Sequence, residues 1–202
     1  MLIEADESQL VLVDFQERLL PAIHQGNECL ANAFKLAHAA QHFDLPAWAT
    51  EQNPSKLGSM PLELKALCRQ TLLKMQFSAS EEGLTDLLRP PVAHKPLAGN
   101  ARSLPKHLQK PPPVVSQRNS VVLAGMEAHV CVLQTALHLL EDEFQVWVVT
   151  DACSSRTERN RDAAYDRLAG AGAELVTTEM VMFEWLRSAE HPCFKDIQAL
   201  IK

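Results

Sequence analysis

Residues 119–132, NSVVLAGMEAHVCV, place an apolar strand directly before a helix whose first turn contains a cysteine. The run VVLAG has no polar side chain, which is typical of a strand that is covered on both faces in a parallel sheet. Similar apolar runs occur at 9–15 (QLVLVDF) and 144–152 (FQVWVVTDA), and stretches of helical periodicity separate them. This alternation predicts an α/β fold with helices on both faces of the sheet.

The rest of the chain continues the same alternation. Further strands are expected at 46–50, 71–77 and 173–178, and helices at 27–42, 61–69, 80–89, 130–140, 158–168 and 193–202. The predicted architecture is a three-layer, Rossmann-like α/β fold with a central, mainly parallel sheet of about six strands. A chain of 202 residues, 47% of them hydrophobic, is expected to form a single domain over residues 1–202.

Composition narrows the range of partners. With 19 basic and 25 acidic residues the formal charge is −6, so nucleic acid is not expected to bind. No apolar run approaches the roughly 20 residues that span a bilayer. Met1 is followed by acidic residues instead of a basic leader, and the five cysteines include no CxxC pair. We therefore expect no membrane association, reduced thiols and a cytoplasmic location.

A basic, proline-rich connector occupies residues 87–126. It contains six lysines and arginines but no aspartate or glutamate, and residues 90–113 hold seven of the 12 prolines. Three interpretations stay open for this connector: a solvated surface excursion, an oligomer contact, or a cationic lid over an anionic substrate.

Three reactive residues are expected at the carboxyl edge of the sheet, where doubly wound folds bind ligands. Asp14 ends an apolar strand, Lys74 lies within TLLKMQF, and Cys131 begins a helix. The helix dipole and a nearby lysine would lower the pKa of the cysteine, a carboxylate could take its proton, and backbone N–H groups at the turn could form an oxyanion hole. Each residue alone also has an ordinary structural interpretation, as a turn cap, a surface charge or a core thiol.

The segments LVLVDFQ, KMQFSAS, and VVLAGMEAHVCV followed by VVTDACSSR resemble the isochorismatase-like cysteine hydrolases, which include nicotinamidases and N-carbamoylsarcosine amidohydrolases. The resemblance runs in order from about residue 10 to residue 185. It is strongest to the metal-free, poorly characterised branch of this superfamily. It implies a hydrolase with a catalytic triad of Asp14, Lys74 and Cys131.

The resemblance further implies an oxyanion hole made by the backbone N–H groups of Glu127 and Cys131, with a cis peptide bond between Met126 and Glu127. In the implied mechanism, Asp14 takes the thiol proton, the thiolate attacks a small amide, and a thioester forms as the C–N bond breaks. Two alternatives stay open: hydrolysis of a vinyl ether, as in isochorismatases, and a catalytically idle member that acts as a binding or scaffold protein.

The sequence departs from the nicotinamidases after the second strand, where those enzymes carry an aspartate and histidines that bind a divalent metal. ATEQNPSKLG stands there, and Glu51 and Gln52 are poor substitutes for histidines. His38 and His42 have a spacing that can bind zinc but lack the adjacent glutamate, so we interpret them as structural. No metal and no cofactor are expected.

Four residues near the triad, Phe15, Gln16, Phe77 and His129, are candidates for the pocket of a small-molecule substrate. Arg156, in TDACSSR, is interpreted as a hydrogen-bonding residue of a turn. The resemblance also implies a homo-oligomer, a dimer or larger, since the family forms such assemblies.

Overall fold

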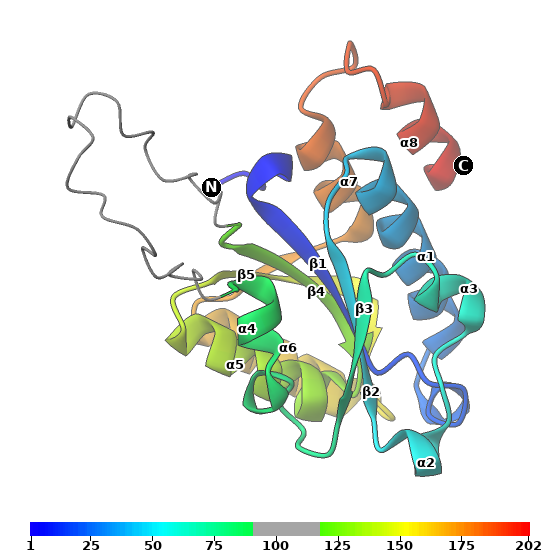
Figure 1. The fold of residues 1–202 in the computed structure, drawn as a ribbon, viewed down its shortest axis with the longest axis vertical. Helices are drawn as coiled ribbons and strands as arrows, with labels where there is room; N and C mark the ends of the chain where they lie inside the picture. The colour runs from blue at the N-terminus through cyan, green and yellow to red at the C-terminus, as the bar shows by residue number, and fades with distance from the viewer. Residues whose placement is uncertain (91–117) are drawn as a thin grey trace, which may run out of the picture.

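A six-stranded, all-parallel sheet forms the centre of the computed structural model, which describes residues 1–90 and 118–202 (Figure 1). The strand order is β3-β2-β1-β4-β5-β6. The strands are β1 (Ser8–Val13), β2 (Ala47–Gln52), β3 (Gln70–Lys74), β4 (Ser120–Met126), β5 (Gln145–Ser154) and β6 (Glu174–Val176). Neighbouring strands are parallel throughout, which confirms the predicted fold class.

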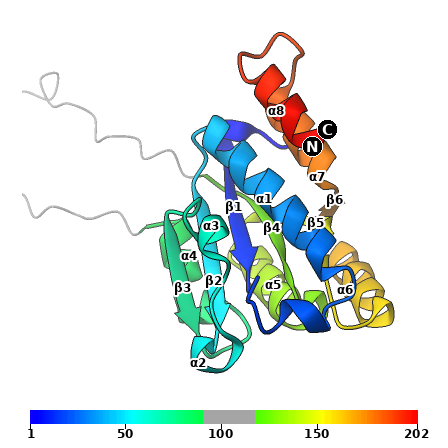
Figure 2. The same cartoon turned by 90° about the vertical axis from the view of Figure 1, so that its right-hand side faces the viewer.

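Helices cover both faces of the sheet (Figure 2). The longer ones are α1 (Gly26–His42), α5 (Leu133–Glu141), α6 (Glu158–Gly170), α7 (Thr178–Leu186) and α8 (Phe194–Ile201). Shorter ones are α2 (Pro54–Leu57), α3 (Leu62–Lys65), α4 (Leu84–Leu88), a π-helix (Ala128–Val132) and three 3₁₀ turns (Ala5–Glu7, Leu20–Ala22 and Ser80–Glu82). None of the helices in the two described stretches is long and apolar enough to cross a membrane.

The core is divided into two layers by the alternation of side chains along the strands. Leu10 and Leu12 of β1 belong to the cluster that also contains buried residues of α1, α7 and α8. Val11 and Val13 of the same strand belong to the cluster on the other face, with α4, α5 and α6. Every residue of β1 and β4 is buried, which explains why both strands are almost continuously apolar.

The structure differs from the expected elements at several places. Helices α2 and α7 were not expected, and the helix predicted at 61–69 is only the single turn α3. The helix predicted at 80–89 is divided at Gly83 into a 3₁₀ turn and α4, and the helix predicted at 130–140 begins as a π-helix at Ala128. Residues 91–117, most of the basic connector at 87–126, lie outside the described residues, so both of its functional interpretations stay predictions.

The switch point of the sheet lies between β1 and β4. The helix that follows β1, α1, packs on one face, and the helix that follows β4, α5, packs on the other (Figure 2). The loops after these two strands therefore diverge and leave space at their carboxyl ends, which is where doubly wound folds bind ligands. Asp14 comes directly after β1, and the π-helix with Cys131 starts two residues after β4.

Gly125 allows β4 to approach β1 and the π-helix closely at this switch point. A Cβ atom built on Gly125 would lie 2.6 Å from Val13 Cβ, 2.8 Å from Val13 O and 2.9 Å from Val132 Cγ2. Two of these atoms belong to the paired strand β1 and cannot move independently of it. A side chain at residue 125 would therefore displace the backbone that carries the site.

Gly125→Ala is expected to lower the free energy of unfolding by about 1–3 kcal/mol because it overpacks a rigid contact. Gly170→Ala is the matched control, since a Cβ there meets no atom within 4 Å and Gly170 lies in the last turn of α6. The control should leave stability unchanged or raise it slightly. Urea titration followed by circular dichroism measures both, and equal stability of the two variants would contradict the packing argument.

Candidate active site

A buried carboxylate ends β1. Asp14 has no exposed surface and adopts a left-handed backbone conformation, with φ at 56°. Its N–H donates to Thr50 O (3.1 Å), while Thr50 Oγ1 donates to Asp14 Oδ1 (2.7 Å) and Lys74 Nζ donates to Asp14 Oδ2 (2.8 Å). Both carboxylate oxygens are thus held by donors from the two strands β2 and β3.

The partner of this carboxylate, Lys74, is the last residue of β3, and its side chain is fully buried. Besides Asp14, its ammonium donates to Gln52 Oε1 (2.7 Å) and to Phe77 O (3.1 Å). These three acceptors satisfy the donors of the ammonium, which is what allows a lysine to remain charged in the interior. The Asp14–Lys74 pair therefore has the hydrogen bonds that a buried ion pair requires.

The candidate nucleophile, Cys131, is the fourth residue of the π-helix and is 4% exposed. Burial of the thiol, and then the negative charge of Asp14, raise the pKa of Cys131 well above its ordinary value, and the charge of Lys74 opposes this only in part. The sequence-based expectation of a lowered pKa is therefore wrong. Burial and the Asp14 carboxylate outweigh the opposing charge of Lys74, so the resting thiol is protonated at neutral pH.

The thiol faces a pocket of about 250 Å³. Cys131, Gln52 and Glu127 contribute polar groups to its lining, and Arg156 contributes a guanidinium. The remaining lining residues are apolar: Leu19, Leu57, Phe77 and Val130. A pocket of this size and composition suits a small molecule with a polar group directed at the thiol.

Of the four residues predicted to line the pocket, Phe77 does so and is half-exposed. Phe15 is instead fully buried in the core beneath α1, because the left-handed turn at Asp14 directs the next side chain inward. Gln16 is fully buried and fixes the chain by donating to Gln52 O (3.0 Å) and accepting from Gln52 N–H (2.8 Å). These two assignments are corrected.

His129 does not line the pocket either. Its Nδ1 lies 2.9 Å from Ser155 Oγ and 3.3 Å from Glu127 Oε2, so the ring faces the turn that follows β5. The prediction that His129 lines the substrate pocket is therefore wrong, and its ring instead contacts Ser155 and Glu127.

The peptide bond between Met126 and Glu127 is trans, so the expectation of a cis bond is wrong. The chain is redirected here by Glu127, whose φ and ψ are 54° and 59°. A cis peptide bond before a non-proline residue lies about 3–4 kcal/mol above the trans bond. A single left-handed residue is less costly than that. Glu127 Oε1 forms a salt bridge with Arg156 Nε, 2.8 Å away.

Sequence reasoning missed the roles of Thr50 and Gln52, which hold Asp14 and Lys74. A signal was present, because residues two apart on a strand share a face, so these two polar side chains point to the same side of β2. Glu51 points to the opposite side, where Oε1 accepts from Met60 N–H (3.0 Å) and Lys65 Nζ (2.9 Å). These contacts give Glu51 a structural role.

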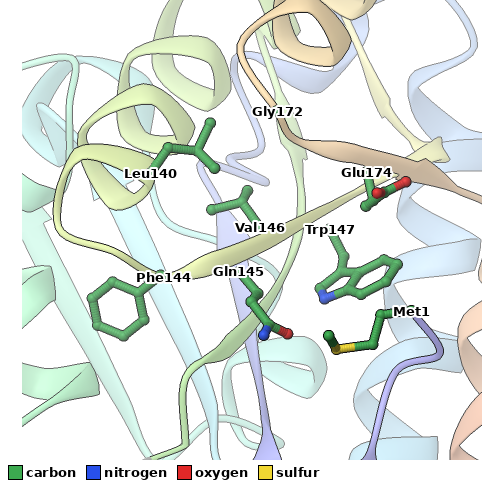
Figure 3. A pocket seen from close by; sticks show the side chains of 8 residues that line it. All are labelled: Met1, Leu140, Phe144, Gln145, Val146, Trp147, Gly172 and Glu174. Atoms are coloured by element: carbon green, nitrogen blue, oxygen red, sulfur yellow. The ribbon is translucent and has the colours of Figure 1, made fainter.

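A second pocket, of about 270 Å³, lies away from this site (Figure 3). It is lined by Met1, Leu140, Phe144, Gln145, Val146, Trp147, Gly172 and Glu174. Residues 144–147 stand at the amino end of β5, whereas Cys131 follows the carboxyl end of β4. The two pockets are therefore at opposite ends of the parallel sheet.

Comparison with known proteins identifies related chains and related structures. The family model of the isochorismatase domain matches residues 8–180. Isochorismatase domain-containing protein 2A of Mus musculus is 36% identical over 197 residues, which cover 98% of this chain and 84% of the relative. The MAR1 ribonuclease from Caenorhabditis elegans superposes with a TM-score of 0.82 and 31% identity, covering 100% of this chain and 92% of the other.

Two further structures share the fold at lower identity. YcaC from Pseudomonas aeruginosa, solved with hexane-2,5-diol and covalent acrylamide, has a TM-score of 0.81 and 23% identity, with 99% and 90% of the two chains covered. YcaC from Escherichia coli, described as an octameric hydrolase of unknown specificity, has a TM-score of 0.76 and 23% identity, with 100% and 95% covered.

Fold and site together define a doubly wound α/β protein with a buried carboxylate, an ammonium and a thiol at the carboxyl edge of its sheet. The match of residues 8–180 to the domain model, with the relatives above 30% identity, identifies the family. This chain belongs to the isochorismatase family, and that membership supports a hydrolase-type function.

Asp14→Asn is expected to make Cys131 more reactive toward iodoacetamide at pH 8, by about tenfold for each unit of pKa lost, because it removes a charge that opposes the thiolate. In the unsubstituted protein the rate should still be rising with pH at pH 9. Peptide mass spectrometry isolates the Cys131 rate from that of the other four cysteines. Asp196→Asn, a change at an exposed side chain, is the control. An unchanged or slower reaction of Asp14→Asn would show that the Asp14 charge is not what limits the reactivity of the resting thiol.

Lys74→Met is expected to lower the free energy of unfolding by about 3–5 kcal/mol, since it leaves the buried Asp14 carboxylate without its counter-charge. Lys56→Met, at an exposed position, should change stability by less than about 0.5 kcal/mol. Guanidinium titration measures the difference. Equal stability of the two variants would contradict the buried ion pair between Asp14 and Lys74.

Proposed function

We propose that this protein hydrolyses the C–N bond of a small amide-like substrate through a covalent intermediate on Cys131. One observation carries the proposal: the thiol faces a pocket while the hydrogen-bonded Asp14–Lys74 pair acts on it from the buried side. This pairs a nucleophile with a base that is itself oriented by a third group. The same three residues carry the sequence resemblance to the cysteine hydrolases.

In the first half-reaction Asp14 takes the proton of Cys131, and the thiolate attacks the carbonyl carbon of the amide. The electron pair of the C=O bond moves to oxygen, where the backbone N–H groups of Glu127 and Cys131 stabilise the negative charge. Collapse restores the C=O bond and breaks the C–N bond. The amine leaves with the proton from Asp14, and a thioester remains on Cys131.

In the second half-reaction Asp14 takes a proton from water as the oxygen attacks the thioester carbon. The carboxylic acid leaves, and the proton returns to the sulfur of Cys131. Lys74 remains an ammonium throughout, because it donates to Asp14, Gln52 and the Phe77 carbonyl and so holds the carboxylate in one orientation. The high pKa of the resting thiol means that deprotonation accompanies substrate binding or attack.

Intact-protein mass spectrometry with a panel of small primary amides and ureido compounds tests this proposal. We expect a transient adduct and turnover with the unsubstituted protein and with Cys193→Ala, and neither with Cys131→Ala. The mass of the adduct would identify the acyl group. Turnover that survives in Cys131→Ala would instead indicate vinyl ether hydrolysis, and an unreactive Cys131 with no turnover would indicate a scaffold role.

The name of the C. elegans relative attributes a ribonuclease activity to that protein, so RNA is included in the panel. The net charge of −6 and the pocket of about 250 Å³ both favour a small molecule over a polynucleotide. RNA cleavage that is lost in Cys131→Ala would contradict the amide proposal while retaining the catalytic residues.

We also propose a homo-oligomeric assembly in the cytoplasm, supported by the description of the E. coli relative as an octamer and by the reduced thiols expected from the cysteine spacing. Light scattering of the purified protein should give a mass that is a multiple of 22.4 kDa. A mass equal to that of one chain at micromolar concentration would contradict the assembly.

A further inference from the structure

Glu127 lines the same pocket as the thiol and has an unusual backbone conformation. Glu127 has φ at 54° and ψ at 59°, values that side chains other than glycine seldom adopt. Asparagine, aspartate and histidine are several-fold enriched in this region, but glutamate is not. No glycine is used, although a glycine would turn the chain here without steric cost. The question is what the glutamate side chain supplies at this position.

The Glu127 side chain is clamped by residues that follow the neighbouring strand. Arg156 Nε forms an ion pair with Glu127 Oε1 at 2.8 Å. Glu127 Oε2 lies 3.3 Å from His129 Nδ1 but has no hydrogen-bond partner among the described residues, and His129 Nδ1 is 2.9 Å from Ser155 Oγ. The strands bring these residues together, because Met126 of β4 is in register with Ser154 of β5. Only 10% of the Glu127 side chain is exposed, so the carboxylate is shielded between the two partners.

This arrangement restrains the Glu127 side chain. Its carboxylate pairs with Arg156, two residues after the end of β5, and lies beside His129 of the π-helix. Arg156 is 58% exposed and lines the pocket, and therefore its removal would not open a cavity in the core. An exposed arginine thus contacts, through a shielded carboxylate, the residue whose left-handed backbone leads into the π-helix of Cys131.

We propose that Arg156, with His129, is a positioning residue that holds the backbone N–H of Glu127 toward the oxygen of the reacting carbonyl group. This inference rests on the proposed function, because it assigns a role within the same site. Removal of the clamp should slow those reactions of Cys131 that place negative charge on a carbonyl oxygen. It should not slow reactions that place none there.

Two reagents distinguish reactions of Cys131 that place negative charge on a carbonyl oxygen from reactions that do not. In the reaction with acrylamide, the thiolate adds to the terminal carbon, the C=C electrons move toward the carbonyl, the oxygen becomes negative, and a proton then adds to the other alkene carbon. In the reaction with iodomethane, the thiolate displaces iodide and no oxyanion forms. The ratio of the two rates at Cys131 therefore reports on oxyanion stabilisation and cancels any change in the pKa of the thiol.

The variants are Arg156→Met, Arg156→Lys and the control Arg159→Met, an exposed arginine three residues further along the chain. We expect Arg156→Met to lower the acrylamide rate at least tenfold while the iodomethane rate stays within twofold. Arg156→Lys should recover much of the loss, because an ammonium can still pair with Glu127. Arg159→Met should leave both rates and their ratio unchanged.

The outcomes distinguish this inference from the proposed function. An equal fall of both rates in Arg156→Met, or an unchanged ratio, overturns the positioning role while Cys131 remains the nucleophile. No reaction of unsubstituted Cys131 with either reagent overturns the proposed function itself. With a turned-over amide, kcat should fall in Arg156→Met and KM should change little, whereas a rise in KM alone would make Arg156 a substrate-binding residue.

Discussion

The buried ion pair between Asp14 and Lys74 constrains the whole carboxyl edge of the sheet. Its two members come from strands that are not neighbours, and Thr50 and Gln52 of the intervening strand β2 complete the network. Desolvating both charges is favourable only if every donor and acceptor is matched. The sheet must therefore keep one register across β1, β2 and β3 for the pair to exist.

The thiol depends on the same pair in two opposing ways. Asp14 raises the pKa of Cys131 and, in the proposed mechanism, also accepts its proton, so the sulfur rests as the neutral thiol. A protonated, buried cysteine reacts slowly with adventitious electrophiles and oxidants, because the thiolate is the reactive form. In this arrangement the thiol has a low reactivity at rest, which favours selective reaction of the nucleophile.

The strands and the convergence of Asp14, Lys74 and Cys131 were predictable, because strands buried on both faces are continuously apolar and their carboxyl ends meet at one edge. Helix α7 was not predictable from hydrophobic periodicity, because apolar side chains lie on both of its faces. Val181 and Met182 are buried, whereas Met180 and Phe183 are exposed. The inward direction of Phe15 and the trans bond before Glu127 depend on left-handed residues that apolar patterns do not reveal. At the site, the local reversals of the backbone were therefore what the sequence could not predict.

Lys74 belongs to an edge strand, and that position has a consequence for how the protein loses activity. Within the described residues β3 pairs only with β2, and Leu73 and Met75 beside the lysine are more than half exposed. Edge elements with few buried contacts open at lower free energy than the centre of a sheet. Fraying of this margin would withdraw the ammonium from Asp14 while β1, β4 and β5 remain folded, so the ion pair, and any activity that depends on it, would be lost by partial unfolding before the core melts.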